Sequence, residues 1–134
     1  TVNEFLSGAR SAYEWILMSF EKNEIDEIRE LLSEEVAEAF DAVVDQRVSQ
    51  GLTIEAEFIG IREMKLVEAT YSSNTKTAEI SVSFVGEMTS VVKNSSGEIV
   101  EGDSKQIKRQ KDTWTFSKDI KSSNPNWLLV ATGE

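Results

Sequence analysis

The stretch RVSQGLTIEAEFIGIREM, residues 47–64, marks the point where the spacing of apolar residues changes from helical to extended. Gly51 within it suits the left-handed conformation that commonly ends a helix, because glycine has no Cβ to clash there. From Leu52 to Phe58, apolar and polar residues alternate, which is typical of a strand with one buried and one solvated face. The sequence therefore predicts helices before Gly51 and strands after it.

Upstream of this point, the pattern predicts three helices between about residues 3 and 50. Apolar residues from Phe5 to Phe20 recur at spacings of three and four, which places them on one stripe of the first helix. Asn23 and Ser33 are residue types that favour helix N-caps, and each precedes a further run with helical spacing. We therefore expect a short second helix after Asn23 and a third helix after Ser33.

Downstream of Gly51, the alternation predicts four antiparallel strands between about residues 52 and 132. It slips at the stretch FIGI, residues 58–61, which indicates a β-bulge that bends the first strand, and Gly86 interrupts the second. Helices followed by strands indicate a single α+β domain over residues 1–134. We expect its three N-terminal helices to pack on one face of a curved four-stranded antiparallel sheet.

A bent sheet wrapped around an N-terminal helix makes a cone, and a cone leaves space between the helix and the concave face of the sheet. We expect the bending at Gly60 and Gly86. Aromatic residues and methionines on the inward faces either fill this space as core or line an apolar pocket that binds a ligand. The candidate lining residues are Tyr13, Phe40, Phe58, Met64, Phe84, Met88, Trp114, Phe116 and Trp127.

Arg47 lies on the same face of the predicted third helix as Phe40 and Val43, near the end where a cation suits the helix dipole. One interpretation packs its aliphatic stem on the core and sends the guanidinium to water or to a strand carboxylate. The other places Arg47 at the mouth of the pocket, where it binds the anionic head of a ligand. The sequence is compatible with both.

The composition, 40% hydrophobic and 28% charged over 134 residues, is that of a soluble globular domain. Histidine and cysteine are absent, which excludes disulfides, zinc sites with those ligands and His-activated nucleophiles, so we expect no cofactor and no metal. The net charge of −10 repels phosphate backbones and argues against nucleic acid as a partner. No apolar run approaches the ~20 residues that span a bilayer, so we expect any membrane anchor outside this chain.

Asp45 and Asp112 are the best candidates for a catalytic acid. Asp45 lies near Arg47 on the predicted third helix, and strand alternation turns Asp112 inward together with Trp114. Each is better explained as a surface or salt-bridged carboxylate, and a single acid without an oxyanion partner is a weak basis for catalysis. We therefore expect no catalytic residue.

Charge is distributed unevenly along the chain. The first 50 residues carry 12 acidic and 4 basic side chains, whereas the segment 105–121 carries 6 basic and 2 acidic ones. If this segment is a strand, Lys105, Arg109 and Lys111 share one face and Lys108 lies on the other. That face is either the solvated side of a strand or a contact patch for anionic lipid or an acidic protein partner.

Three stretches together resemble one known family. They are the tail DTWTFSKDIKSSNPNWLLVAT (112–132), the opening FLSGARSAYEWILMSFEKNEIDEIRELLSEEV (5–36) and FDAVVDQRVSQG (40–51). They resemble the C-terminal domain of the motor-tethering subunit of the mitochondrial inner-membrane import translocase, the Tim44-like family. The resemblance covers essentially the whole chain, and the NPNW form of the tail is more similar to bacterial members.

The resemblance implies a cone-shaped fold similar to nuclear transport factor two, in a domain that lies on the inner membrane, and a scaffold or translocation-linked role without chemistry. We expect the domain on the cytoplasmic side, with membrane lipid or a membrane protein as partner. The inward aromatic residues and methionines add an apolar molecule as a candidate ligand of the pocket. Mitochondrial members bind the motor chaperone and the channel through upstream segments, so the tethering role is not carried over. Two alternatives stay open: an isomerase, dehydratase or hydrolase of the same cone fold, and a carrier of an apolar small molecule.

Overall fold

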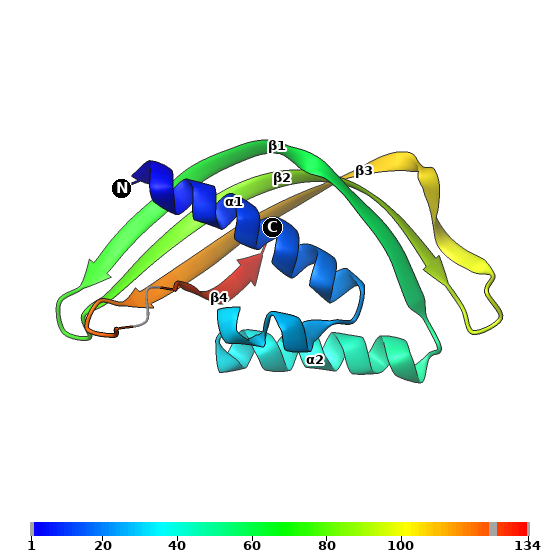
Figure 1. The fold of residues 1–134 in the computed structure, drawn as a ribbon, viewed down its shortest axis with the longest axis horizontal. Helices are drawn as coiled ribbons and strands as arrows, with labels where there is room; N and C mark the ends of the chain where they lie inside the picture. Colours follow the sequence, from blue (N-terminus) through cyan, green and yellow to red (C-terminus); the bar gives the residue numbers. More distant parts are fainter. Residues whose placement is uncertain (1, 124–125, 134) are drawn as a thin grey trace.

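The computed structural model describes residues 2–123 and 126–133. It shows an α+β fold in which a curved four-stranded antiparallel sheet arches over the helices, with strand order β1-β2-β3-β4 (Figure 1). In chain order, the elements are α1 (Val2–Glu21), the 3-10 helices η1 (Ile25–Glu27) and η2 (Arg29–Leu31), α2 (Glu34–Ser49), β1 (Thr53–Ser72), β2 (Thr77–Lys93), β3 (Ile99–Asp119) and β4 (Leu128–Gly133).

The α+β class and the four-stranded antiparallel sheet are confirmed, but the predicted second α-helix is wrong. The segment after α1 forms η1 and η2 instead, and Asn23 caps neither of them. Asn23 has a φ of 61° and ends α1 in the left-handed region. Leu32 must be extended because it bridges to Leu129 in β4, and this long-range contact stops a helix from running through the segment.

The local signals around α2 and β1 are confirmed. The Ser33 Oγ accepts a hydrogen bond from the Val36 N–H at 3.3 Å, which caps the start of α2. Gly51 follows α2 with a φ of 69°, the conformation that favours glycine. The helix-to-strand switch therefore lies where the spacing of apolar residues predicts it.

Bulges in two strands accompany the curvature of the sheet. The register between β1 and β2 shifts between Phe58 and Gly60, at the predicted slip, and again between Ile61 and Glu63 and between Leu66 and Glu68. In β3, residues 104–107 lie opposite the single residue Thr89 of β2. The kink that this creates is visible in the yellow part of β3 in Figure 1.

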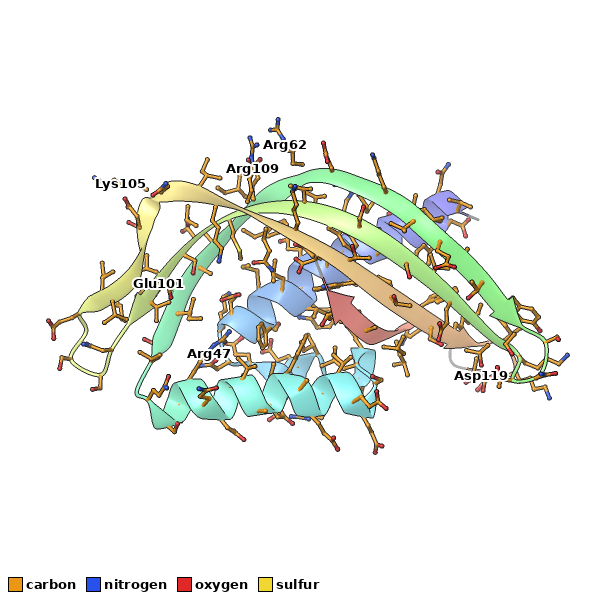
Figure 2. All side chains as sticks on the ribbon, turned by 180° about the vertical axis from the view of Figure 1, so that it is seen from behind. Arg47, Arg62, Glu101, Lys105, Arg109 and Asp119 are labelled. Carbon is orange, nitrogen blue, oxygen red and sulfur yellow. The ribbon has the colours of Figure 1, made fainter. Side chains whose placement is uncertain are left out.

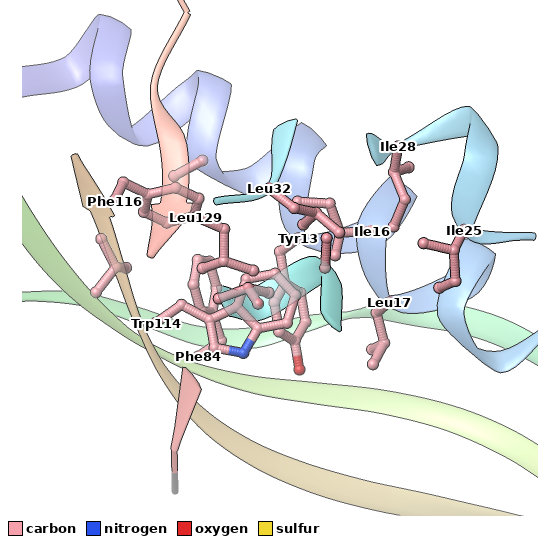
Figure 3. Packing of buried hydrophobic residues seen from close by; sticks show 14 of the residues in the cluster. Tyr13, Ile16, Leu17, Ile25, Ile28, Leu32, Phe84, Trp114, Phe116 and Leu129 are labelled. Atoms are coloured by element: carbon pink, nitrogen blue, oxygen red, sulfur yellow. The ribbon is translucent and has the colours of Figure 1, made fainter. Parts of the chain in front are cut away.

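The core fills the concave side of the sheet, and Tyr13 of α1 lies at its centre (Figure 3). Its ring is fully buried and stacks on Phe84 with centroids 4.2 Å apart. The ring centroid of Trp114 lies 4.7 Å from it, and Phe58 contacts it edge-on. One aromatic side chain thus joins the middle of α1 to β1, β2 and β3.

Gly86 of β2 makes room for this ring. A Cβ atom at Gly86 would lie 2.9 Å from the Tyr13 Oη and 3.0 Å from its Cε2, closer than side chains tolerate. Gly60, the other expected bending position, has no such neighbour within 4 Å. Gly86 is therefore required for close packing of α1 on the sheet, whereas Gly60 is not.

We expect Gly86→Ala to lower the free energy of unfolding by about 1–3 kcal/mol, because the added methyl group pushes Tyr13 away from Phe84. Urea denaturation followed by circular dichroism measures this. Gly60→Ala is the matched control, since it adds the same methyl group to a neighbouring strand in open space. Equal stability of the two variants would contradict the close packing described here.

Candidate functional site

The residues predicted to line a pocket divide into two sets. Five are 0–3% exposed and fill the core, namely Tyr13, Phe84, Met88, Trp114 and Phe116. The other apolar candidates are partly buried and pack against the margin of the core, namely Phe40, Phe58, Met64 and Trp127. Only Phe116 and Trp127 also line the groove described next, and a ligand-binding role for the whole set stays a prediction.

A groove of about 470 Å³, which we call the α1 groove, runs along the N-terminal half of α1. Its floor is formed by small residues of α1, Gly8, Ala9 and Ala12, which leave space beside the helix. Phe5 and Trp127 form an aromatic wall, with ring centroids 5.0 Å apart in an edge-on contact. The remaining lining residues are Glu4, Ile16, Leu31, Phe116, Lys118 and Asn126.

Asp112 points inward with Trp114, as strand alternation predicts, and it accepts two hydrogen bonds. The Tyr13 hydroxyl donates to its Oδ2 at 2.7 Å, and the Gln110 Nε2 donates to the same oxygen at 3.0 Å. Burial, the hydrogen bond to Asp112 and the charge of that carboxylate raise the pKa of Tyr13 well above its ordinary value. Tyr13 is therefore a neutral donor that holds α1 to β3.

Arg47, on the last turn of α2, reaches across to the end of α1. Its Nη1 donates to the Phe20 carbonyl at 2.8 Å and to the Asn23 Oδ1 at 3.0 Å. The guanidinium carbon lies 4.5 Å from the centroid of the Phe20 ring, a cation–π contact. Arg47 thus satisfies a carbonyl at the C-terminal end of α1, and it also lines a second pocket.

This second cavity, which we call the polar pocket, has a volume of about 430 Å³. It lies between the C-terminal ends of α1 and α2 and the half of the sheet that contains the N-terminal half of β3. Four charged residues from three elements line it, namely Glu21, Arg47, Glu101 and Lys108. Leu52, Ile54, Ser90, Val92 and Gly102 complete the wall.

Burial raises the pKa of the Glu21 carboxyl, the charges of Arg47 and Lys108 act to lower it, and the charge of Asp112 acts to raise it. The sequence analysis did not identify Glu21, yet a signal was present. Glu21 follows Tyr13 and Leu17 at intervals of four, so it continues the inward stripe of α1. Strand alternation places Lys108 on the face opposite Arg109, but it does not extend to Glu101, because residues 104–107 interrupt the register between them.

The predicted basic patch lies mainly on the outside of the arch. Figure 2 shows Lys105 and Arg109 there, together with Arg62 of β1. The Arg109 Nε lies 3.3 Å from a carboxylate oxygen of Glu87. Lys111 is exposed two residues further along β3, and Lys108 lines the polar pocket on the opposite face, as alternation predicts. We call Arg62, Lys105, Arg109 and Lys111 the outer basic patch.

These features define a small α+β domain whose curved sheet has pockets on its concave side and a basic crest outside. The family model for the Tim44-like domain matches residues 1–134, and the chain belongs to this family. The crystal structure of the intermembrane space region of the chloroplast protein ARC6 matches with a TM-score of 0.60 at 10% identity, covering 95% of this chain and 93% of that one. This likeness shows the fold. No curated protein sequence matches the chain.

Within the described part of the chain, neither helix combines the length and the hydropathy that a bilayer-spanning segment needs.

Asp45, one of the two candidate catalytic acids, is exposed on α2, on the surface of the domain.

We expect Tyr13→Phe to lower the free energy of unfolding by about 1–2 kcal/mol at neutral pH, because Asp112 loses a buried hydrogen-bond donor. Unfolded tyrosine releases its proton near pH 10, whereas folded Tyr13 retains it, so the stability contributed by Tyr13 is full below about pH 10 and falls above it. Urea unfolding at pH 8 and at about pH 11 measures the difference in free energy of unfolding between wild type and variant. This difference should be smaller at the higher pH.

Tyr71→Phe provides the matched control, since Tyr71 is 55% exposed on β1. It should leave stability and its pH dependence unchanged. A gap between wild type and Tyr13→Phe that is equal at both pH values would contradict the assignment of Tyr13 as a buried neutral donor.

Proposed function

We propose that this Tim44-like chain is a non-enzymatic, membrane-associated binding or scaffold domain with a role linked to protein translocation. Its outer basic patch contacts anionic lipid or an acidic membrane-protein partner. In this proposal the domain is bacterial, has the cone shape of nuclear transport factor two, and lies on the cytoplasmic side of the inner membrane. A segment outside this chain anchors it. Membership of the family supports the role, and the outer surface of the sheet supports the mode of contact.

The observation that carries this proposal is the mixture of exposed apolar and basic side chains near the bulges of β1 and β3. Ile59 lies at the first bulge of β1 and is 52% exposed, and Ile107 lies at the bulge of β3 and is 55% exposed. Both are close in sequence to the arginines and lysines of the outer basic patch. Exposed apolar side chains beside cations are typical of surfaces that rest at a membrane interface.

The strength of this contact is limited by charge. Each basic side chain near an anionic membrane contributes about 1 kcal/mol to binding. The contribution of Arg109 is smaller, because it forms an ion pair with Glu87. The whole domain carries a net charge of −10, which opposes approach. Unaided binding is therefore weak and sensitive to salt, and the anchor supplies most of the attachment.

The structure also favours a non-enzymatic role over an enzyme of the same fold. Asp112 is hydrogen-bonded to both Tyr13 and Gln110 within the core, and Asp45 is exposed on α2. Neither carboxylate lines the α1 groove or the polar pocket. The two candidate catalytic acids thus line neither pocket, although the charge of Asp112 acts on Glu21 of the polar pocket.

Co-sedimentation with vesicles tests the contact. We expect wild type to pellet with anionic vesicles at about 50 mM salt, and much less at about 500 mM salt or with neutral vesicles. Lys105→Glu, Arg109→Glu and Lys111→Glu combined should abolish pelleting. Lys22→Glu, Lys76→Glu and Lys121→Glu combined change the net charge equally at other positions and should retain most of it. Equal behaviour of the two triple variants would rule out the outer basic patch as the contact.

The α1 groove favours a second candidate function, transport of an apolar small molecule. Its floor and aromatic wall are apolar, and Lys118 at its edge offers a cation to an acidic head. A side chain at Gly8 would meet nothing within 4 Å, so the groove is open at that point.

For this candidate, we expect dodecanoate to change the fluorescence of Trp127 in wild type, and Gly8→Leu to weaken its binding about tenfold or more by occupying the groove. Leucine also raises helix propensity relative to glycine, so the variant should fold. Ser7→Leu, on the exposed neighbouring residue, is the control and should bind as wild type does. Absence of binding, or equal binding by both variants, would exclude a carrier role for the groove.

A further inference from the structure

The charged residues of the polar pocket come from three elements that the fold brings together at one end of the arch. Glu21 comes from the end of α1, Arg47 from the end of α2, and Glu101 and Lys108 from β3. Figure 2 shows Arg47 and Glu101 beneath the arch, on the opposite side of the sheet from Arg62 and Arg109. The pocket is therefore separate from the outer basic patch and from the α1 groove.

The four charged side chains of this pocket are not paired with one another. Among the described residues, no ion pair of 4.0 Å or less joins any two of them. Arg47 uses only Nη1 in hydrogen bonds to the protein, so its Nε and Nη2 stay available as donors. Since no buried side-chain nitrogen or oxygen of the described residues lacks a partner, neither of these two nitrogens is fully buried.

The charge of the lining selects among ligands. Two cations and two carboxylates line the pocket, so a simple anion meets two repelling carboxylates and a simple cation meets two repelling cations. A neutral zwitterion satisfies both pairs. Arg47, Lys108 and the Ser90 hydroxyl together offer more donors than a carboxylate can use, which suits the tetrahedral oxygens of a phosphate.

We propose that the polar pocket binds a small phosphate–ammonium zwitterion of the phosphoethanolamine class. Its phosphate contacts Arg47 and Lys108, and its ammonium group contacts Glu21 and Glu101. The apolar side chains of Leu52, Ile54 and Val92 accommodate the short linker between the two charges. The same chemistry is offered by a lipid headgroup and by a free soluble molecule.

The partly buried carboxyl of Glu21 is consistent with this role. Its burial raises its pKa and therefore disfavours the charged form that Arg47 and Lys108 stabilise. An ammonium group beside Glu21 would add a third cation next to that carboxylate. The ammonium group then offsets the repulsion between Glu21 and the phosphate bound by Arg47 and Lys108.

Calorimetric titration with glycerophosphoethanolamine tests the proposal, with glycerol 3-phosphate and ethanolamine as the separate halves of the probe. We expect the zwitterion to bind about tenfold or more tightly than either half. Lys108→Met should weaken both the zwitterion and glycerol 3-phosphate. Glu101→Gln should weaken the zwitterion but leave glycerol 3-phosphate unchanged or bound more tightly. Both substituted residues are exposed, so the variants should fold.

Lys111→Met is the control, since it removes a neighbouring charge of β3 from the outer face and should not alter binding in the pocket. Vesicles with phosphatidylethanolamine or phosphatidylcholine headgroups identify the source of the zwitterion. Binding that prefers phosphatidylethanolamine and is lost in Lys108→Met supports a lipid source, whereas binding of the soluble probe alone supports a free one. Two results would overturn the proposal: no loss in Lys108→Met and Glu101→Gln with either source, or glycerol 3-phosphate binding as tightly as the zwitterion.

Discussion

The position of the Tyr13 ring is the constraint on which the rest of the structure depends. The ring lies in the space left by Gly86, stacks on Phe84 and donates a hydrogen bond to Asp112. These contacts fix the middle of α1 against the centre of the sheet. The two ends of α1 then diverge from the curved strands, and each end opens a cavity. The α1 groove lies along its N-terminal half, and the polar pocket lies beside Glu21 at its C-terminal end.

Features of the fold that depend on neighbouring residues could be predicted from the sequence. The N-cap at Ser33, the left-handed Gly51 and the bulge at Ile59 each follow from a few adjacent positions. The prediction of a second helix failed because Leu32 is held extended by its bridge to Leu129, which lies far away in the chain. The irregular stretch 104–107 of β3 could not be predicted either, since its exposed residues follow no apolar period.

For the candidate site, the sequence predicted which side chains point inward better than it predicted where a cavity lies. Alternation correctly turned Asp112 and Trp114 inward, but whether inward side chains leave a cavity depends on how partners fit, as Tyr13 fits beneath Gly86. Arg47 was identified as a residue of interest, and its role in binding the anionic head of a ligand stays a prediction. Its guanidinium hydrogen-bonds with Phe20 and Asn23 rather than with a strand carboxylate, and the residue also lines the polar pocket.

The two faces of the sheet place the proposed contacts on opposite sides of the domain. Arg62, Lys105 and Arg109 lie outside the arch, whereas Arg47 and Glu101 lie beneath it with the acidic helix α2 (Figure 2). In the proposed membrane contact, this separation of charge turns the outer basic patch toward the anionic surface and α2 away from it, even though the net charge is repulsive. In that orientation, Arg47 and Glu101 of the polar pocket lie on the side of the sheet that faces away from the bilayer. A planar membrane therefore cannot occupy both sites at once, so simultaneous binding requires a free zwitterion rather than a headgroup of the contacted membrane.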